Sequence, residues 1–256
     1  MNRRSQRNTG GWLALLMLLC IPALLAVAQD KGQKTIAILY FENNSVVDKE
    51  KLDPLKKGLA DMLITEMSKV KSLTVVERQR IQSVVEELNL GETDLVDKNT
   101  SQKMGKLLGA KVLLFGGFSN LFGDKLRIDA RIVATETGVT LKAEEETGDL
   151  DQFLTMLKSL VKKLSDDLEV KLSKTEEDQL EASKDGKFSG YVTYAQALNL
   201  EDNGRKLEKL GKKGEAMSMY ENAKAMYQKA WDESSGYEPA KQKVEEMATL
   251  VAKMKK

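Results

Sequence analysis

The sequence predicts an α/β protein with a mixed sheet, followed by an all-helical segment. Continuous apolar runs at 35–41 and 112–115 are typical of strands that are buried on both faces. Strict apolar/polar alternation over 126–132 is typical of a strand with one face in water. From residue 188 onward the apolar spacing is helical. The predicted order is βαβααβββα, an α+β sandwich, with helices after it.

In the first half of the chain, the strand at 35–41 is followed by a helix that Asp53-Pro54 opens. Asp is a preferred N-cap, and Pro is favoured at the first helical position. A second strand at 73–76 leads into a helix over 81–88, whose apolar residues fall on one face. This alternation of strand and helix predicts parallel strand pairing at the start of the sheet.

The middle of the chain predicts a short helix and then the rest of the sheet. Thr100 or Ser101 is expected to cap the helix, and Gly109 to close it. After the strands at 112–115 and 126–132, the alternation continues on a strand over 139–143. These strands form an antiparallel meander.

A long helix is predicted after the sheet, capped by Asp149 or Asp151. Its apolar residues form one stripe: Phe153, Leu157, Leu160, Val161, Leu164 and Leu168. A stripe of this length is sufficient to hold the helix across a sheet.

Residues 1–28 have the pattern of a signal peptide. Arg3, Arg4 and Arg7 precede an apolar stretch at 12–27, which is short for a membrane span of about 20 residues. Ala26-Val27-Ala28 has the small-x-small form of a signal peptidase site. We therefore expect export, cleavage after Ala28, a periplasmic location and no transmembrane span in the mature chain. An uncleaved signal anchor is the alternative.

Composition excludes several classes of function. The chain has no His, and its one Cys, Cys20, lies in the predicted signal peptide. A disulfide, a thiol nucleophile, an imidazole base and a Cys/His metal site are therefore excluded from the mature chain. Removing residues 1–28 takes three of the 40 Lys and Arg and none of the 39 Asp and Glu, which leaves a net charge of −2. So balanced a charge predicts no nucleic-acid partner. We expect no catalytic, cofactor-binding or metal-binding residues.

Two short motifs have both a chemical and a structural interpretation. Glu77-Arg78 follows a strand and is compatible with a catalytic acid beside a substrate clamp. The favoured interpretation is structural, with Glu77 at a helix N-terminus and Arg78 on a neighbouring carboxylate. Gly116-Gly117 lacks the spacing of a phosphate-binding loop, which favours a bulge or a close backbone approach.

Charged residues on the predicted meander also allow two interpretations. Arg127, Asp129 and Arg131 share one face, where a cross-strand charge ladder is favoured over a binding patch. The run at 144–146 is acidic, but consecutive residues of a strand point to opposite faces. That arrangement is poor for binding a cation.

Most of the aromatic residues of the mature chain lie in the C-terminal part. They are Phe188, Tyr191, Tyr194, Tyr220, Tyr227, Trp231 and Tyr237. Packing in a helical core is the favoured explanation. The alternative is a protein-binding groove, because aromatic residues dominate interface hot spots. Tyr220, Tyr227, Trp231 and Tyr237 are the candidate binding residues.

Four segments together resemble the curli production assembly/transport component (CsgG) family: 36–43, 73–79, 110–117 and 126–138. The resemblance covers about 34–170 and implies a periplasmic α/β core. Pore-forming members of that family insert two β-hairpins into the outer membrane. The corresponding connections here, 120–125 and 148–151, are too short for spanning strands. We therefore expect a CsgG-like domain without the membrane hairpins.

The C-terminal part loosely resembles one tetratricopeptide unit, because Ala223, Tyr227 and Ala230 have the spacing of its second helix. The expected organisation is a signal peptide at 1–28, a CsgG-like domain at 34–172, a charged linker at 173–187 and a helical tail at 188–256.

The resemblance implies a non-enzymatic envelope protein that assists secretion or assembly of surface components through protein–protein contacts. One alternative is a periplasmic regulator that docks on a cell-wall synthase. An alternative of another class is a hydrolase that uses carboxylates alone. Envelope proteins are the expected partners. Homo-oligomerisation and peripheral association with the outer membrane are left open.

Overall fold

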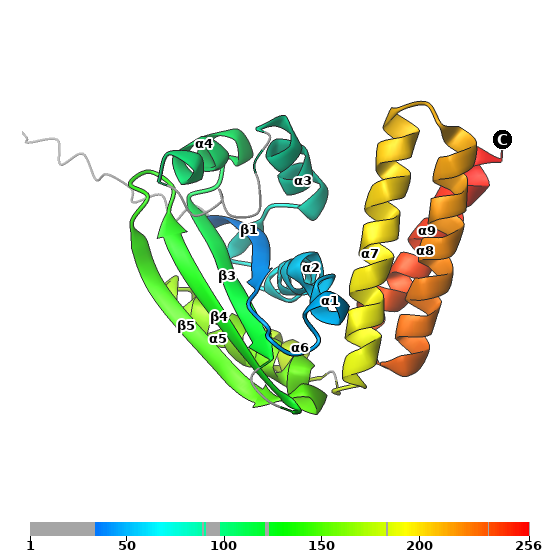
Figure 1. Ribbon diagram of the computed structural model, residues 1–256. Helices are drawn as coiled ribbons and strands as arrows, with labels where there is room; N and C mark the ends of the chain where they lie inside the picture. The colour runs from blue at the N-terminus through cyan, green and yellow to red at the C-terminus, as the bar shows by residue number, and fades with distance from the viewer. Residues whose placement is uncertain are drawn as a thin grey trace, which may run out of the picture. The chain divides into compact units, whose positions relative to one another are not determined.

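A mixed five-stranded sheet forms the centre of the protein, in the order β2-β1-β3-β4-β5 (Figure 1). The computed structural model describes residues 34–88, 90, 98–120, 123–182, 184–234 and 236–255. The strands are β1 (Lys34–Asn43), β2 (Leu73–Val75), β3 (Val112–Asn120), β4 (Lys125–Ala134) and β5 (Thr140–Asp149). β1 pairs in parallel with β2 and β3, whereas β3, β4 and β5 form an antiparallel meander. The predicted fold class is confirmed.

The described helices follow the predicted order, with two additional single turns, α1 and η2, and one additional helix, α6. Those before β3 are α1 (Lys49–Leu52), α2 (Leu55–Met67), α3 (Arg78–Glu87) and α4 (Lys98–Leu108). Those after β5 are η2 (Leu150–Gln152), α5 (Phe153–Asp167), α6 (Lys174–Glu181), α7 (Phe188–Lys209), α8 (Lys213–Glu233) and α9 (Glu238–Met254).

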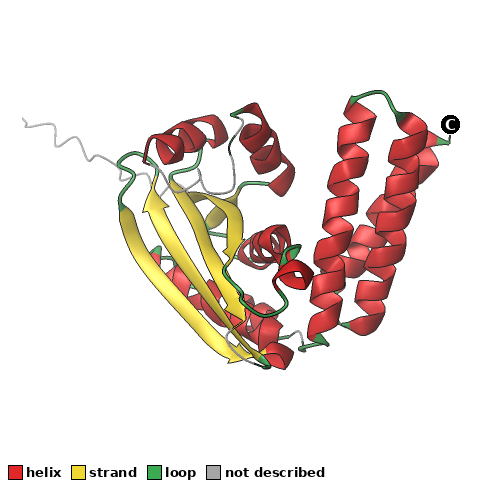
Figure 2. Cartoon of the chain, in the orientation of Figure 1, coloured by secondary structure: helices red, strands yellow, loops and turns green. Residues whose placement is uncertain are grey.

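Helices cover both faces of the sheet. The step from β1 to β2 and the step from β2 to β3 run in opposite directions, so right-handed crossovers place α2 on one face and α3 with α4 on the other. α5 packs on β5 and beside α2 (Figure 2). The apolar positions of β4 are buried, as are those of the α5 stripe, while Arg127 and Arg131 on the other face of β4 are not. The predicted alternation is confirmed for β4. Its predicted continuation over 139–143 is wrong, because Val139 precedes β5 and Leu141 and Ala143 are exposed, while the half-buried face of β5 carries Glu144 and Glu146.

The predicted N-cap at Asp53 is wrong. The one-turn helix α1 runs almost directly into α2, so Asp53 has helical backbone angles and stands at the C-cap of α1. Pro54 occupies the N-cap position of α2. The Asp53 carboxylate instead pairs with Lys56 at 2.9 Å. Pro54 therefore joins α1 to α2 with helical backbone angles, and Asp53 does not mark the start of a helix.

The caps of the later helices differ from the predictions in a similar way. Asp149 precedes the 3₁₀ turn η2 and makes no capping hydrogen bond, and Gln152 stands at the N-cap of α5. α4 begins at Lys98, so Ser101 lies inside it rather than before it. Gly109 does follow α4 with a φ of 66°, the left-handed conformation of a helix-closing glycine.

Residues 173–187, expected to be a charged linker, contain the helix α6. Ser173 and Glu176 form a reciprocal capping box at its start. Leu180 is fully buried, and the Glu176 carboxylate also accepts a hydrogen bond from the backbone of Lys71. α6 is therefore anchored by one apolar side chain in the core and by a hydrogen bond to the connection between α2 and β2.

The connections at the two positions of the family's membrane hairpins are short. Four residues separate β3 from β4, and η2 follows β5 without a gap. Across the described ranges, no helix combines the length and apolarity that a membrane crossing needs. The predicted signal peptide and its cleavage site lie outside the described residues.

The C-terminal helices α7 and α8 pack against each other, and α9 packs on α8. The predicted stripe of α8 is buried: Ala216, Tyr220, Ala223, Tyr227 and Ala230. The kinship of these helices to a tetratricopeptide repeat stays a prediction.

Candidate functional site

A chain of aromatic rings joins the C-terminal helices to the α/β part of the molecule. Phe153 of α5 lies 5.1 Å from Tyr191 of α7, and Tyr191 lies 5.4 Å from Tyr237, measured between ring centroids. Tyr194 is 5.2 Å from both Tyr237 and Tyr227. Such tilted and edge-on contacts stabilise a core beyond the area that they bury. Residues Gln33–Lys256 accordingly form one compact unit.

Three of the four aromatic residues proposed to bind a partner are part of this interior. Tyr220 and Tyr227 are fully buried, and Tyr237 is 2 % exposed. Their rings therefore have no accessible face to offer another protein in this conformation. Trp231 is only partly buried, and the ammonium of Lys241 lies 5.8 Å from its ring centroid. A binding role for Trp231 stays a prediction.

α2 and α7 approach closely where a glycine faces an alanine. A Cβ added to Gly58 of α2 would lie 2.4 Å from the Cβ of Ala195 of α7. The two helices can therefore approach this closely only because Gly58 has no side chain. The same contact lets the Tyr194 hydroxyl donate a hydrogen bond of 2.6 Å to Asp61 of α2. The seam between the two helices thus combines close packing with a buried polar contact.

Arg78, the first residue of α3, lies in the middle of this seam and is 2 % exposed. Its guanidinium contacts Asp61 of α2 at 2.9 Å, Asp202 of α7 at 2.6 Å and Glu201 of α7 at 3.7 Å. Burial acts to lower the pKa of Arg78, but Asp61, Asp202 and Glu201 outweigh it and raise that pKa. The structural interpretation of Arg78 is confirmed.

Glu77 does not cap α3 with its side chain, although it occupies the N-cap position of that helix. The sequence pattern therefore placed Glu77 correctly at the N-terminus of α3, but the Glu77 side chain makes no capping hydrogen bond there.

Glu201 is the most buried carboxylate of the seam, with no exposed surface. It accepts hydrogen bonds from the Tyr227 hydroxyl at 2.7 Å and from Arg205 at 2.8 Å, and it pairs with Lys243 at 3.2 Å. Burial acts to raise the pKa of Glu201. Lys243, Arg78, the Tyr227 hydrogen bond and Arg205 outweigh burial and lower the pKa to about 2. Glu201 therefore stays ionised at neutral pH and is unsuited to general-acid catalysis.

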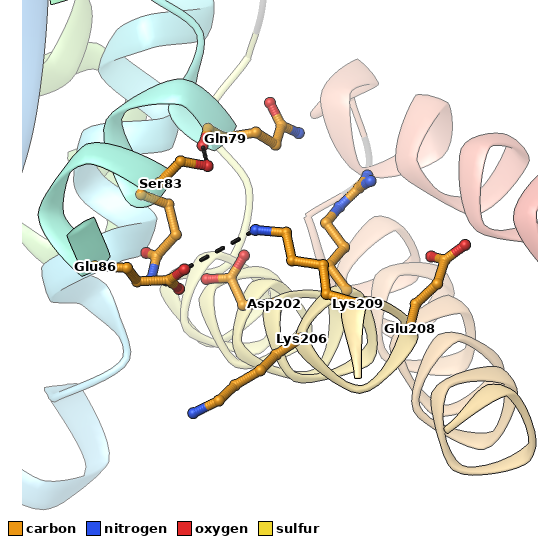
Figure 3. A pocket seen from close by; sticks show the side chains of 9 residues that line it. Gln79, Ser83, Glu86, Asp202, Lys206, Glu208 and Lys209 are labelled. Atoms are coloured by element: carbon orange, nitrogen blue, oxygen red, sulfur yellow. Dashed lines mark hydrogen bonds and ion pairs between the residues drawn. The ribbon is translucent and has the colours of Figure 1, made fainter. Parts of the chain in front are cut away.

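A cleft of about 420 Å³ lies beside this ion cluster, between α3 and α7 (Figure 3). The side chains that line it are Gln79, Gln82, Ser83 and Glu86 of α3 and Asp202, Arg205, Lys206, Glu208 and Lys209 of α7. Glu86 and Lys209 approach across it to 4.0 Å. We refer to this site as the α3–α7 cleft.

The acidic groups of the α3–α7 cleft are engaged within the protein. Asp202 pairs with Lys57 at 3.2 Å as well as with Arg78. Glu208 accepts a hydrogen bond of 2.7 Å from the Tyr220 hydroxyl, and Glu86 accepts one of 2.6 Å from Gln82. These contacts hold the three carboxylates in fixed positions on the walls of the cleft.

The donors on the two walls suit binding rather than catalysis. Ser83 donates its hydroxyl hydrogen bond to the backbone oxygen of Gln79, one turn earlier, so no base activates it. Lys206 has no side-chain partner within the described part of the chain. The cleft therefore offers hydrogen-bonding and cationic groups without a nucleophile–base pair.

The other predicted motifs lie on the sheet, away from the cleft. A Cβ on Gly116 would lie 1.8 Å from the backbone oxygen of Asp129, so the predicted close backbone approach is confirmed. Arg127 pairs with Asp129 at 2.7 Å and with Glu145 at 2.6 Å, as a charge ladder requires. Arg131 instead lines a hollow of about 260 Å³ together with Glu42 and Asp129.

The acidic run of β5 divides between the two faces, as predicted. Glu145 pairs with Arg127 on one face, whereas Glu146 pairs with Lys163 of α5 at 3.0 Å on the other. Within the described ranges, no group of three or more Asp, Glu, His or Cys residues is placed to hold a metal ion.

Comparison with known proteins supports the resemblance seen in the sequence. The family model of the curli production assembly/transport component CsgG matches residues 23–121. The predicted resemblance, which covers about 34–170, is confirmed for 34–121 and stays a prediction for 122–170. No curated protein matches the chain.

Two solved structures illustrate the likeness to known folds. The LpoB C-terminal domain from Salmonella enterica is 12 % identical, with a TM-score of 0.32, over 46 % of this chain and 84 % of that one. Lipoprotein GNA1162 from Neisseria meningitidis is 14 % identical, with a TM-score of 0.38, over 54 % of this chain and 99 % of that one.

Proposed function

We propose that this chain is a non-enzymatic protein of the cell envelope that assists secretion or assembly of surface components through contacts with other proteins. The observation that carries the proposal is the match to the CsgG family over residues 23–121, since that family is described by its part in curli assembly and transport. The export signal expected at residues 1–28 is consistent with such a location.

The ionisation of the carboxyl groups supports a non-catalytic role. A hydrolase that uses carboxylates alone needs one carboxyl group whose pKa is raised, so that it can donate a proton. Where the pKa of a carboxyl group is shifted in the described part of the chain, it is lowered, as at Glu176, Glu181 and Glu201. These three groups are held as anions by hydrogen bonds and cations.

The α3–α7 cleft is the surface that we assign to partner binding. It is concave, and both walls carry polar side chains on rigid helices, which is the arrangement expected of a specific recognition site. Lys206 presents an ammonium group to it, whereas the Gln82 amide is engaged with Glu86. A polar segment with at least one acidic group is the partner surface that complements this ammonium group.

A deletion strain tests this proposal. We expect loss of the gene to reduce the amount of a surface component that leaves the cell, and the full chain to restore it. Lys206→Glu should fail to restore export, because it reverses the charge of the donor wall. Lys253→Glu, an equal change at an exposed position of α9, should restore export fully.

Both variants should melt like the parent chain, so that a failure to complement reports binding rather than folding. Normal export in the deletion strain would contradict the proposal. Normal export combined with a defect in cell-wall synthesis would instead favour the regulator of a cell-wall synthase.

A further inference from the structure

The free edge of β5 is the feature of the sheet that the proposed function does not use. β5 is ten residues long and lies at one end of the strand order, with no strand on its outer side among the described residues (Figure 1). The opposite edge, β2, has only three residues. Proteins usually shorten, cover or interrupt such edges, because the unpaired backbone groups are a template for another strand.

The pairing with β4 fixes which backbone groups of β5 are open. The backbone N–H of Leu150 donates to the oxygen of Asp124 at 2.7 Å, so the pair 124–150 is hydrogen-bonded. Hydrogen-bonded pairs alternate with non-bonded pairs along an antiparallel ladder. From 144 to 148, the even-numbered residues of β5 therefore bond to β4. The odd-numbered residues at 143, 145 and 147 direct their N–H and C=O groups outward.

We propose that β5 pairs in an antiparallel manner with β5 of a second copy of this chain, around a two-fold axis at Ala143. In this register the backbones of the two Ala143 residues face each other as a hydrogen-bonded pair. Lys142 of each copy then lies opposite Glu144 of the second copy, so two pairs of opposite charge flank the axis. The two sheets become one continuous sheet, as an isologous dimer requires.

The neighbouring registers place like charges opposite each other. An axis at Lys142 sets Lys142 against its own counterpart, and an axis at Glu144 does the same for Glu144. An axis at Glu145 opposes Glu145 to itself and Glu144 to Glu146. Because like charges directly opposite destabilise a strand pair, charge selects the register centred on Ala143.

One exposed apolar residue supports the same arrangement. Leu141 lies at the start of β5 and is 51 % exposed. In the proposed register, Leu141 lies opposite Glu145 of the second copy and diagonal to Ala143 of that copy, within reach across the pair. The pairing of β5 with β4 shifts register next to Leu141, and the backbone oxygen of Val139 accepts a hydrogen bond from Ala134 of the same chain. The pairing with a second copy therefore ends at Leu141.

Cysteine cross-linking tests the register. The full chain carries Cys20→Ser, so that an introduced thiol is its only one. Ala143→Cys should form a disulfide-linked dimer on mild oxidation, because residues in a hydrogen-bonded pair have Cα atoms about 5.5 Å apart, within disulfide range. Glu145→Cys is the matched control on the same face. Its counterpart in the second copy lies about 13 Å away, and it should remain monomeric on a non-reducing gel.

Charge reversal tests the pairing independently of oxidation. Lys142→Glu and Glu144→Lys should each raise the dissociation constant of the dimer about tenfold in sedimentation velocity. The double variant, with the charges exchanged, should restore it. Lys142 also pairs with Asp167 of its own chain at 3.5 Å. The double variant, in which residue 142 is Glu, does not restore the ion pair with Asp167. Recovery of the dimer in that variant would therefore report the contact between the two copies.

Three results would overturn the proposal. They are a chain that is monomeric at every concentration, cross-linking as efficient from position 145 as from 143, and a dimer indifferent to the charge reversals. Cross-linking of position 143 only to a different protein would assign the edge to that protein and not to a second copy.

Discussion

Arg78 and Asp202 lie 2.6 Å apart although 124 residues separate them in the sequence. Arg78 opens α3 in the α/β part of the molecule, and Asp202 lies on α7 among the C-terminal helices. Because Arg78 also contacts Asp61 and Glu201, a single buried guanidinium holds carboxylates from α2 and α7 together. The two regions are therefore expected to unfold together.

Replacement of Arg78 tests this coupling. Arg78→Met leaves Asp61, Glu201 and Asp202 short of a cation inside the seam, and removal of one partner from a buried ion pair costs about 3–5 kcal/mol. We expect the free energy of unfolding to fall by that amount in chemical denaturation. Arg80→Met, on the exposed side of the same helix, loses only a hydrogen bond to the backbone oxygen of Leu107 and should change it by about 1 kcal/mol or less. Equal effects of the two variants would contradict the coupling.

Glu201 predicts a particular dependence of stability on pH. Its pKa is lowered from the usual 4.5 to about 2 in the folded chain, so its contribution is complete above pH 4.5 and is lost as the pH falls towards 2. The contribution is up to about 3 kcal/mol. Denaturation of the parent and of Glu201→Gln at pH 5 and pH 2 should show the difference between them shrinking.

The exposed Glu245→Gln is the control for that pH dependence, and it should track the parent chain at both pH values. A gap between the parent and Glu201→Gln that stays constant from pH 5 to pH 2 would show that Glu201 is not held as an anion.

Two aromatic residues of α8, the buried Tyr227 and the partly buried Trp231, should differ in their effect on stability. Tyr227→Ala removes a fully buried ring that packs on Tyr194, and we expect a loss of about 3–5 kcal/mol in thermal or chemical unfolding. Trp231→Ala should cost less, because Trp231 is only partly buried. If Trp231 contacts a partner, this variant should also weaken partner capture. A large stability loss from Trp231 alone would reverse the assignment.

The close approach of α2 and α7 can be tested with one methyl group. Gly58→Ala places a Cβ 2.4 Å from that of Ala195, so the helices must separate, at a cost of about 1–3 kcal/mol. Gly214→Ala is the matched control in α8, where an added Cβ meets nothing within 4 Å. It should stabilise the chain slightly, by less than about 1 kcal/mol, because alanine favours a helix but Gly214 lies in the first turn of α8. Stabilisation by both changes would rule out the tight contact.

The sequence predicted those parts of the fold that are determined by local periodicity. β1 and the alternating residues of β4 could be recognised because their burial repeats along the strand. The predictions that Asp53 and Asp149 cap the main helices were wrong, because a single helical turn comes directly before each of these helices. A single turn is too short to produce a recognisable apolar period in the sequence. α6 had a usable signal, the Ser173-x-x-Glu176 capping box, but it lay within a charged stretch that suggested a linker.

The seam and the α3–α7 cleft depend on contacts that no local pattern reveals. The sequence indicated that Arg78 would pair with a carboxylate, but it could not identify Asp202 among the 39 acidic residues. The polar side chains that α3 directs into the cleft resemble the solvent-facing side of any surface helix. Only the position of α7 turns that side into a wall of a binding site.

Photo-cross-linking from the cleft in living cells tests the central claim most directly. A photoreactive amino acid is placed at position 206 in the full chain, in a deletion strain whose export defect that chain complements. The account predicts a covalent adduct with a surface component or with its export machinery, and no such adduct when the same amino acid replaces Lys253. Complementation without any adduct from position 206, or with the same adduct from position 253, would contradict it.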